Sequence, residues 1–330
     1  MHVTYSRNVF IPLTNACRNA CAYCGFRSSK PWIMSRREVE SLLLEGVKHG
    51  CKEALFTFGE KPESNPAVGR QLHQWGYSNV LEYIYDLCLL ALKHGLLPHS
   101  NPGVLTMDEL KALKEVNASL GLMLENSSPR LCLKGMPHYH SPGKNPKLRL
   151  RTIRNAGKLR IPFTTGLLVG IGERMEEIEA SLHDIAELHS RYGHIQEIII
   201  QNFRPKKGTP MEACPEPSAY EIIWVIKLAK KLLPNIGLQV PPNLNPHKWG
   251  IYLLFGVNDL GGISPVTSDY INPPDAWPKV VEVESRLMPL GYRLKERLPI
   301  YPEYIARGWF SGELKPLIFK YADRDGLVIT

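Results

Sequence analysis

Short apolar runs alternate with longer amphipathic segments from the start of the chain to about residue 260. The runs are rich in β-branched residues, as strands buried on both faces are, and several of the longer segments repeat apolar residues at helical spacing. This alternation is typical of a parallel sheet built from βα units. Eight runs are expected to be strands, at residues 9–14, 54–58, 96–99, 118–124, 163–170, 195–203, 236–240 and 255–260. Eight βα units predict an α/β fold of the (β/α)8 TIM-barrel type.

Capping boxes, in which a serine or threonine is followed three residues later by glutamate, mark the starts of three helices. A further helix is expected after Glu173, where acidic residues suit the positive end of the helix dipole. The three capping boxes are Ser35 with Glu38, Thr106 with Glu109, and Ser218 with Glu221.

The C-terminal part of the chain does not follow this alternation of strands and helices. We expect a single domain over residues 1–330, with a barrel core at about 5–260 and an irregular extension at about 261–330. Residues 261–277 are too rich in proline for a helix, whereas residues 276–290 can form one. Two placements of residues 261–277 stay open. The segment either folds across the mouth of the barrel and excludes water, or wraps the surface and closes the bottom.

Composition narrows the function classes. The chain has 330 residues, 44% of them hydrophobic, and a formal net charge of +8. Seven lysines and arginines and no acid lie in residues 144–160, but no aromatic residues interleave with them as in nucleic-acid modules. A solvated helix face with one or two functional arginines explains the segment better, so no nucleic acid partner is expected.

Neither a membrane nor an oxidising compartment is expected. No apolar stretch is long enough to span a bilayer, and the start, M-H-V-T-Y-S-R, has no long apolar core behind a basic flank. The chain has seven cysteines, an odd number, of which three are clustered and four scattered. This usage fits a reducing compartment better than a disulfide framework, so we expect a cytoplasmic protein.

The clustered cysteines form the most informative motif. Cys17, Cys21 and Cys24 make a C-x3-C-x2-C array directly after the first predicted strand. A structural zinc site or an ordinary ferredoxin cluster takes four protein ligands, so three thiolates leave one metal position open. An open position on a redox cluster invites a small-molecule ligand. A degraded zinc knuckle or chance clustering are the alternatives.

Polar residues and glycines recur where the predicted strands end. In a (β/α)8 barrel the loops after the strands build the active site, so these residues are expected on the same rim as the cysteines. They include Gly59, Glu60, Ser100, Asn101, Glu125, Gly170, Glu173, Asn202, Arg204, Gln239 and Asn243.

The cysteine array, with Tyr23 just before the third cysteine, resembles the cluster loop of the radical S-adenosylmethionine (SAM) superfamily. The resemblance implies one [4Fe-4S] cluster held by Cys17, Cys21 and Cys24, with SAM chelating the fourth iron through its amino and carboxylate groups. It also implies a low-potential electron donor, since reductive cleavage of the sulfonium needs an electron delivered beside the breaking bond.

The same resemblance implies the residues that bind SAM. F-G-E, which contains Gly59 and Glu60, stands where backbone carbonyls usually hold the methionyl amino group. Glu125 stands where a polar residue bonds the ribose or the amine. Arg149 is expected to pair with the methionyl carboxylate, with Arg151 as the reserve.

A further segment, G-L-L-V-G-I-G-E, resembles the element that packs against adenine. It contributes Gly166, Gly170 and Glu173 to the expected SAM site.

Longer strings resemble one subgroup, the CofG-type 7,8-didemethyl-8-hydroxy-5-deazariboflavin (FO) synthases. They include F-T-F-G-E-K-P-E, L-P-H-S-N-P-G-V-L, H-Y-H-S-P-G-K-N-P and N-D-L-G-G-I-S-P-V-T-S-D-Y-I-N-P. The resemblance implies a lyase that converts 5-amino-5-(4-hydroxybenzyl)-6-(D-ribitylimino)-5,6-dihydrouracil to the deazaflavin and releases ammonia. A separate radical SAM subunit would make this substrate from tyrosine, because the chain has one cluster motif.

Residues for the substrate are expected among polar groups at the later strand ends. His138 and His140 are candidate acid–base groups, since histidine titrates near neutral pH. The expected substrate contacts are Asn202, Arg204, Gln239, Asn243, Asn258 and Asp259.

Other functions stay open at this point. They are the partner subunit acting on tyrosine, another biotin-synthase-like radical enzyme, an iron–sulfur electron carrier and a zinc-binding interaction module.

Overall fold

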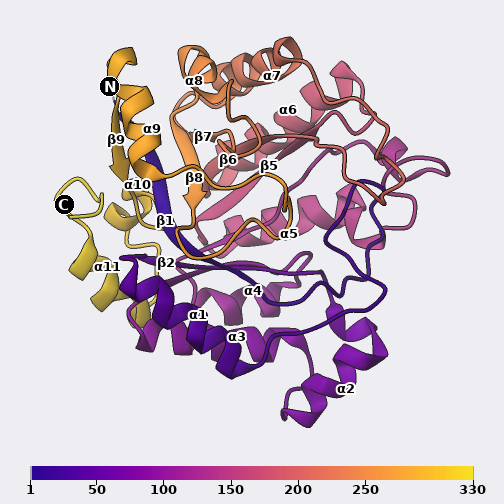
Figure 1. The fold of residues 1–330 in the computed structure, drawn as a ribbon, viewed down its shortest axis with the longest axis vertical. Helices are drawn as coiled ribbons and strands as arrows, with labels where there is room; N and C mark the ends of the chain where they lie inside the picture. The colour runs from indigo at the N-terminus through magenta and orange to yellow at the C-terminus, as the bar shows by residue number, and fades with distance from the viewer. Residues whose placement is uncertain (1, 330) are drawn as a thin grey trace.

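Parallel strands close into a barrel in the computed structural model, which describes residues 2–329 (Figure 1). The order β2-β3-β4-β5-β6-β7-β8-β1 closes through a pairing of β1 with β2. The predicted (β/α)8 fold is therefore confirmed. The strands are β1 (His2–Pro12), β2 (Glu53–Thr57), β3 (Leu97–Asn101), β4 (Ser119–Gly121), β5 (Phe163–Val169), β6 (Ile195–Asn202), β7 (Gly237–Gln239) and β8 (Asp259–Ile263).

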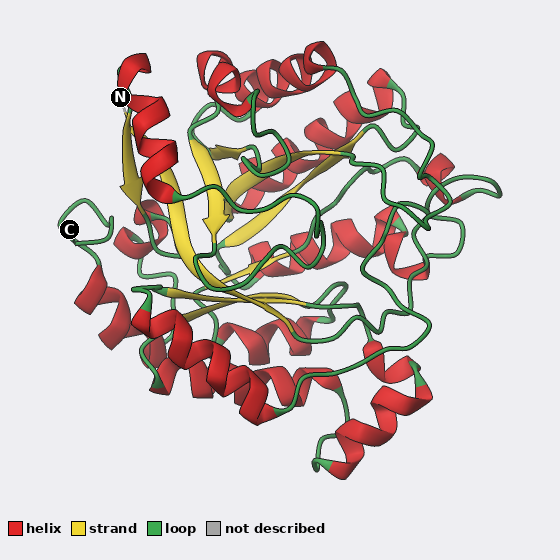
Figure 2. Cartoon of the chain, viewed as in Figure 1, coloured by secondary structure: helices red, strands yellow, loops and turns green. Residues whose placement is uncertain are grey.

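Helices surround this barrel (Figure 2). The three predicted capping boxes are present at Ser35, Thr106 and Ser218. The helices of the barrel are α1 (Arg36–Lys48), α2 (Pro66–Gln74), α3 (Val80–Lys93), α4 (Met107–Lys114), α5 (Pro146–Lys158), α6 (Met175–Tyr192), α7 (Ala219–Leu232) and α8 (Trp249–Tyr252). Short 3-10 turns are η1 (Pro62–Ser64), η2 (Pro129–Cys132), η3 (Pro142–Lys144), η4 (Leu253–Phe255), η5 (Met288–Leu290) and η6 (Gly312–Leu314).

The first strand is longer than expected because its polar first half also pairs. Residues 8–12 of β1 pair with β2. Thr4 pairs with Asp259 of β8 and also with Lys295 of β9 (Arg293–Glu296), which therefore lie on opposite edges of β1. The alternation of H-V-T-Y-S-R, rather than a continuous apolar run, hid this half in the sequence.

The eighth strand starts later than expected. Residues 253–255 form the 3-10 turn η4, and Gly256 reverses the chain with a φ of 116°. The strand then runs from Asp259 to Ile263 through two glycines, which weaken the apolar signal. The strand predicted at residues 255–260 therefore begins about four residues too early.

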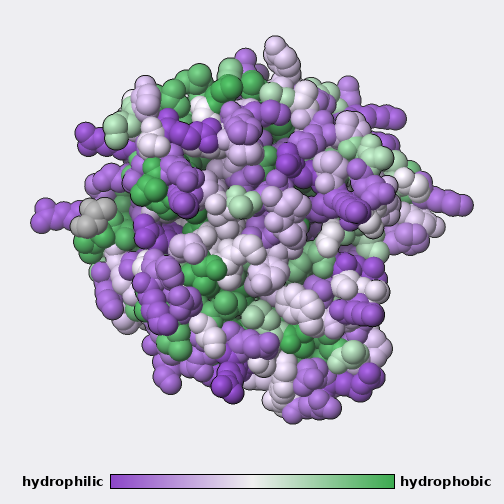
Figure 3. All heavy atoms as spheres, viewed as in Figure 1, coloured by the Kyte–Doolittle hydropathy of each residue, from purple (hydrophilic) through white to green (hydrophobic). Residues whose placement is uncertain are grey.

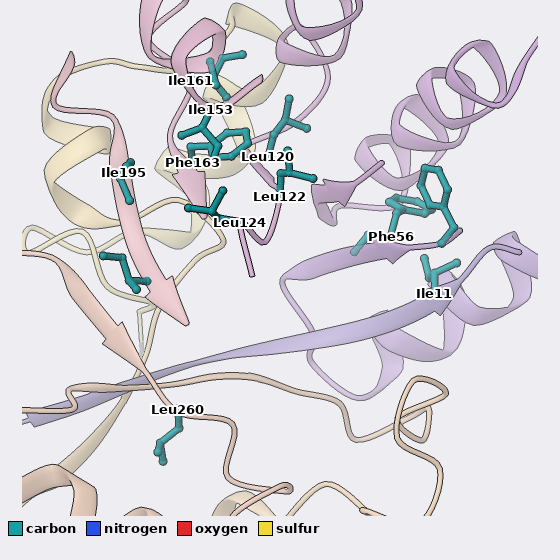
Figure 4. Packing of buried hydrophobic residues seen from close by; sticks show 14 of the residues in the cluster. Ile11, Phe56, Leu120, Leu122, Leu124, Ile153, Ile161, Phe163, Ile195 and Leu260 are labelled. Carbon is teal, nitrogen blue, oxygen red and sulfur yellow. The ribbon is translucent and has the colours of Figure 1, made fainter. Parts of the chain in front are cut away.

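The main core lies between the barrel and the helices (Figure 4). Ile153 of α5 packs with Leu120, Ile161 and Phe163, and all four are almost fully buried. Burial of such a side chain stabilises the fold by about 1.5–3 kcal/mol. This layer holds the strand ends in place.

The outer surface is mostly polar. On the face shown in Figure 3, polar residues predominate and apolar residues are scattered in small groups. None of the helices within residues 2–329 is long and apolar enough to cross a bilayer.

The C-terminal extension is more regular than expected, with β9, α9 (Val280–Leu287), α10 (Pro302–Ala306) and α11 (Lys315–Tyr321). A second apolar cluster joins Leu298, Ile300 and Tyr304 to the start of the barrel strands at Leu97 and Ala118. Figure 1 shows α10 and α11 at the opposite end of the barrel from the indigo loop that follows β1. Residues 297–328 therefore close the bottom of the barrel.

An ion-pair network joins this extension to the strands. Arg297 is 4% exposed and bonds Asp259 at 2.6 and 2.9 Å and Glu197 at 2.8 Å. Thr164 and Tyr301 also donate to Glu197, at 3.0 and 3.1 Å. The single positive charge of the guanidinium is therefore shared by two buried carboxyl groups at the barrel floor, and burial raises the pKa of Glu197 to about 7.

Arg297→Met should lower the free energy of unfolding by about 3–5 kcal/mol, because Glu197 and Asp259 would remain buried without a counter-charge. Arg324→Met, at an exposed arginine, should change it by less than about 0.5 kcal/mol. Urea unfolding followed by circular dichroism measures both. Equal stabilities of the two variants would contradict the assigned role of Arg297.

Candidate active site

One cavity runs from the cysteine loop down into the barrel. Its volume is ≈ 400 Å³, and its wall includes Cys17, Cys21 and Cys24 at the mouth and Arg297 and Pro299 at the floor. This size is in the range of small-molecule sites. The barrel interior is thus open to a ligand that enters from the cysteine end.

The three cysteines lie on the loop after β1, and two of them, Cys17 and Cys21, accept hydrogen bonds from neighbouring groups. Cys17 Sγ accepts from the backbone N–H of Asn19 at 3.4 Å and of Glu60 at 3.2 Å. Cys21 Sγ accepts from the Ser141 hydroxyl at 3.3 Å. Burial raises the pKa of Cys21 to about 11, so binding of a metal group here would displace protons.

This donor set fits an iron–sulfur cluster better than a single ion. Within residues 2–329 no three His, Cys, Asp or Glu side chains are grouped as ligands of one metal ion. A cubane cluster distributes its thiolates over different irons, so its ligands lie farther apart. All seven cysteines are free thiols.

Gly59 allows the cysteine loop to lie against the end of β2. A Cβ atom at this position would lie 1.8 Å from the Ala16 carbonyl oxygen and 2.7 Å from Cys17 Cβ. The Gly59 N–H donates to Thr14 at 3.0 Å, and Arg18 N–H donates to the Glu60 carbonyl at 2.9 Å. The F-G-E motif therefore fixes the position of Cys17.

The Glu60 carboxylate, also on the cavity wall, is held on several sides. Arg18 Nε donates to it at 2.6 Å, Val104 N–H at 3.2 Å, and Arg149 Nη1 lies 3.7 Å away. Gly103 and Gly143 pack against it so closely that a Cβ on either would collide with the carboxylate.

A second buried carboxylate, Glu125, lines the same cavity in a left-handed conformation with a φ of 65°. Tyr23 and Lys144 donate to its two oxygens. Burial alone would raise the pKa of Glu125, but Lys144, His138 and Arg149 hold this pKa well below its usual range. Glu125 is therefore an ionised acceptor at the rim.

The two histidines expected to act as acid and base do not line the cavity. His138 is buried behind the wall, with Nε2 3.0 Å from the Tyr23 hydroxyl and 3.1 Å from Glu125. His140 is exposed, and its ring packs against Tyr139. Their loop packs against the outer side of the cysteine loop. The Ala20 N–H of the cysteine loop donates to the His140 carbonyl oxygen at 3.0 Å. Neither histidine is part of the cavity wall, and their role as acid and base stays a prediction.

The two arginines proposed for the carboxylate of SAM lie on different faces of α5. Arg149 is 4% exposed, lines the cavity, and donates to the carbonyls of Met123 at 2.7 Å and Gly143 at 3.0 Å. Arg151 is on the exposed face of the helix. The reserve assignment of Arg151 therefore has no place in the cavity.

The segment expected to pack against adenine, residues 166–173, forms the end of β5 and the turn after it, and its glycines face away from the cavity. Gly166 faces the β6 backbone, where a Cβ would lie 2.1 Å from the Ile199 oxygen. Gly170 has a φ of 98°, and Glu173 accepts from its N–H at 2.6 Å and from Ile171 at 2.8 Å. Gly166, Gly170 and Glu173 are not part of the cavity wall, to which β5 contributes Thr164 and Leu168.

Four of the six expected substrate contacts line the cavity, namely Asn202, Arg204, Gln239 and Asn243. The other two do not. Because β8 begins at Asp259, Asp259 and the exposed Asn258 lie at the bottom end, where Asp259 pairs with Arg297. Their expected position at the rim is wrong.

The segment after β8 reaches the mouth of the barrel. Asn243 donates to Asp269 at 2.9 Å and to the Asp275 carbonyl at 3.1 Å, while Arg204 donates to the Asp275 carboxylate at 2.8 Å. Asp269 and Trp277 line the cavity. Residues 264–277 thus lie at the mouth, in agreement with the first of the two placements left open for this segment, and it is a later part of the extension, residues 297–328, that lies at the bottom.

Several residues of the wall were missed in the sequence. Lys144 was included in a basic segment interpreted as a solvated helix face, although it precedes the helix and follows Gly143. Lys206 stands in R-P-K-K after β6, and His99 ends the predicted third strand. Strand alternation would have placed His99 and Asn101 on the inner face.

Comparison with known proteins gives consistent matches. A family model described as the Radical SAM superfamily matches residues 11–185. A 7,8-didemethyl-8-hydroxy-5-deazariboflavin synthase of Methanocaldococcus jannaschii is 56% identical over 311 residues, which cover 94% of this chain and 87% of the relative. A protein of the same name from Methanopyrus kandleri is 48% identical over 330 residues, covering 98% and 99%.

Solved structures share the fold. Methylornithine synthase (PylB) matches with a TM-score of 0.69 and 19% identity, over 89% of this chain and 83% of that one. The FeFe-hydrogenase maturase HydG from Carboxydothermus hydrogenoformans matches with a TM-score of 0.74 and 16% identity, over 98% and 76%.

Gly59→Ala should reduce the iron bound after anaerobic reconstitution, because the new methyl group displaces Ala16 and Cys17. Gly312→Ala is the control, since a Cβ there meets no atom within 4 Å. Iron per folded chain, measured by a colorimetric assay and circular dichroism, should fall several-fold only in the first variant. Native iron content in Gly59→Ala would refute the close approach.

Proposed function

The chain belongs to the radical SAM superfamily and, within it, to the 7,8-didemethyl-8-hydroxy-5-deazariboflavin synthases, and we propose how its cavity carries out that reaction. It is a radical SAM enzyme that forms the deazaflavin from 5-amino-5-(4-hydroxybenzyl)-6-(D-ribitylimino)-5,6-dihydrouracil and releases ammonia. The observation that carries the assignment is near full-length identity to synthases of that name. The cavity that joins three thiols to a polar barrel interior supports it.

Family membership implies a [4Fe-4S] cluster and SAM. When bound, these supply the 5'-deoxyadenosyl radical that abstracts a hydrogen atom from the substrate. Cys17, Cys21 and Cys24 would hold the cluster, because they share one end of the cavity and present three thiols.

Residues beside the thiols are proposed to orient SAM. Arg149 is buried, faces the cavity and carries a positive charge suited to the methionyl carboxylate. Glu60 and Glu125 are buried carboxylates suited to the methionyl amine and the ribose hydroxyls. Tyr23 fixes Glu125 by donating a hydrogen bond. Gly59 allows the end of β2, with Glu60, to lie close to Cys17.

Water exclusion at the rim is assigned to apolar packing and to the segment at the mouth. Tyr23, Leu131, Leu168, Ile171 and Phe203 form an apolar cluster against which Cys21 and Cys24 pack. Residues 264–277 are tied to the barrel through Asn243 and Arg204. A radical formed here would meet few water molecules.

The substrate is proposed to occupy the interior below the cysteines. The Gln239 amide faces the cavity and has no side-chain partner among the described residues, so it can pair with the dihydrouracil ring. Asn202, Arg204 and Asn243 are proposed to border the ring from neighbouring strand ends.

The partners expected from the sequence are part of this proposal. A separate radical SAM subunit would supply the dihydrouracil substrate, and a low-potential donor would supply the electron. We further propose a cytoplasmic location and one functional domain over residues 1–330.

The reaction is tested by anaerobic incubation with reductant, SAM and the dihydrouracil adduct. A brown protein with about four irons per chain should yield a fluorescent deazaflavin and ammonia in equal amounts. A Cys17→Ala, Cys21→Ala, Cys24→Ala variant should give neither product. Formation of 5'-deoxyadenosine by the native chain without deazaflavin would reject the substrate assignment.

Arg149→Ala should raise the dissociation constant of SAM about 10- to 100-fold, the expected effect of losing charge-assisted hydrogen bonds. Arg151→Ala, on the exposed face of the same helix, should leave it unchanged. Equilibrium dialysis with labelled SAM measures both. Equal dissociation constants for the two variants would reject the role of Arg149.

A further inference from the structure

His99 is the histidine in the cavity wall, although the sequence pointed to two others. It lies on β3 in register with Leu55 of β2, and it is 7% exposed. None of the roles described above uses it. Its position raises the question of which ring nitrogen faces a ligand.

A chain of hydrogen bonds determines the tautomer of His99. The Ser119 hydroxyl lies 2.6 Å from the Pro299 carbonyl oxygen, which can only accept, so Ser119 donates its proton there. Ser119 Oγ also lies 2.6 Å from His99 Nδ1. Because the serine proton is already used, Nδ1 must carry the hydrogen and donate it. Nε2 is therefore the nitrogen with the lone pair.

The ring stays neutral in this environment. Burial lowers the pKa of His99 to about 4, and the charge of Arg297 adds to the effect. At neutral pH, Nε2 is a hydrogen-bond acceptor.

A second acceptor lies beside this nitrogen. Asn101 Oδ1 is 3.4 Å from His99 Nε2, while Asn101 Nδ2 faces the Thr57 hydroxyl at 3.4 Å. In this orientation of the amide a donor of a ligand can bond both acceptors, and in the opposite orientation Nδ2 of Asn101 would itself donate to Nε2, so a ligand donor competes with that internal bond. Gly121 lets both side chains lie directly against its backbone, because a Cβ there would lie 2.1 Å from Asn101 Oδ1 and 2.9 Å from His99 Nε2. The wall therefore presents both groups at one place, where a donor of a ligand can reach them.

The depth of this pair limits which donor can reach it. His99 is level with Leu55, four residues before Gly59, so ~13 Å of chain at ~3.3 Å per strand residue separates its level from the cysteine loop, and ~10 Å in depth because barrel strands are tilted. The carbon that reacts must lie near the cluster at the mouth. A group that reaches His99 is therefore at the remote end of the substrate. On the dihydrouracil adduct, the remote donors are the phenol and ribityl hydroxyls.

We propose that His99 Nε2 and Asn101 Oδ1 together bind a hydroxyl group of the substrate, and so determine its depth and specificity in the barrel. This inference rests on the proposed function. The C-terminal extension takes part through the Pro299 carbonyl, which fixes the orientation of His99.

Two substitutions separate this role from a structural one. His99→Gln places an amide oxygen near the position of Nε2 but loses the contact with Ser119. His99→Asn keeps a donor near the position of Nδ1 but leaves nothing at Nε2. We expect His99→Asn to raise the substrate dissociation constant and lower kcat/KM about tenfold, and His99→Gln to stay within about threefold of the native chain. A purely structural role predicts the reverse order and would overturn the proposal.

Gly121→Ala provides a second route that keeps the chemistry of His99 but moves it. Its methyl group would collide with Asn101 Oδ1 and His99 Nε2 and displace both, so substrate affinity should again fall about tenfold. His183→Asn, at an exposed histidine of α6, is the control. Iron content and circular dichroism establish that each variant is folded, and substrate binding is measured anaerobically by quenching of tryptophan fluorescence.

Substrate analogues identify the hydroxyl. One analogue carries benzyl in place of 4-hydroxybenzyl, and the other carries a ribityl chain shortened at its end. The analogue that lacks the bound hydroxyl should bind the native chain and His99→Asn equally. If both analogues still distinguish the two proteins, the hydroxyl assignment is overturned.

The proposed function and this inference fail in different ways. Native protein that cleaves SAM but does not convert the adduct overturns both. Native protein that forms the deazaflavin, while His99→Asn binds the adduct as tightly as native, overturns the inference alone.

Discussion

The buried guanidinium of Arg297 is the contact on which the barrel floor depends. It joins Glu197 of β6 and Asp259 of β8 to the chain that leaves β9. Two residues later, the Pro299 carbonyl accepts from Ser119 and from Gln196. Such a network is not a strong source of stability, since desolvation offsets much of the attraction. Its consequence is positional: the extension ends the cavity at a defined depth and fixes the tautomer of His99.

The structure of the barrel mouth depends on a different constraint, the close approach of the β2 backbone to the cysteine loop. Gly59 brings β2 against the cysteine loop, while Gly103 and Gly143 enclose Glu60. The apolar cluster under Cys21 and Cys24 keeps this end dry. Floor and mouth together explain how one barrel can hold a radical source and a long polar substrate in line. In the proposed arrangement the reacting carbon lies at the mouth, and the remote hydroxyl lies at the floor.

Local patterns predicted the barrel and the cysteine loop because both are encoded over short stretches. Capping boxes at Ser35, Thr106 and Ser218 start helices as expected, and C-x3-C-x2-C follows the first strand. Contacts between distant segments were not predictable in this way. The two glycines of β8 hid its register, which misplaced Asp259. Residue type alone favoured His138 and His140, whereas burial and the contact with Ser119 single out His99.

The proposed function and the role of His99 both require the substrate to lie along the barrel axis between the three thiols and the floor. A crystal structure of the anaerobic protein with cluster, SAM and the dihydrouracil adduct would show its position. Density is expected for a substrate hydroxyl within hydrogen-bond distance of His99 Nε2, with the adduct extending from there toward Cys17, Cys21 and Cys24. An adduct bound across the mouth, with water at His99 and Asn101, would contradict this placement.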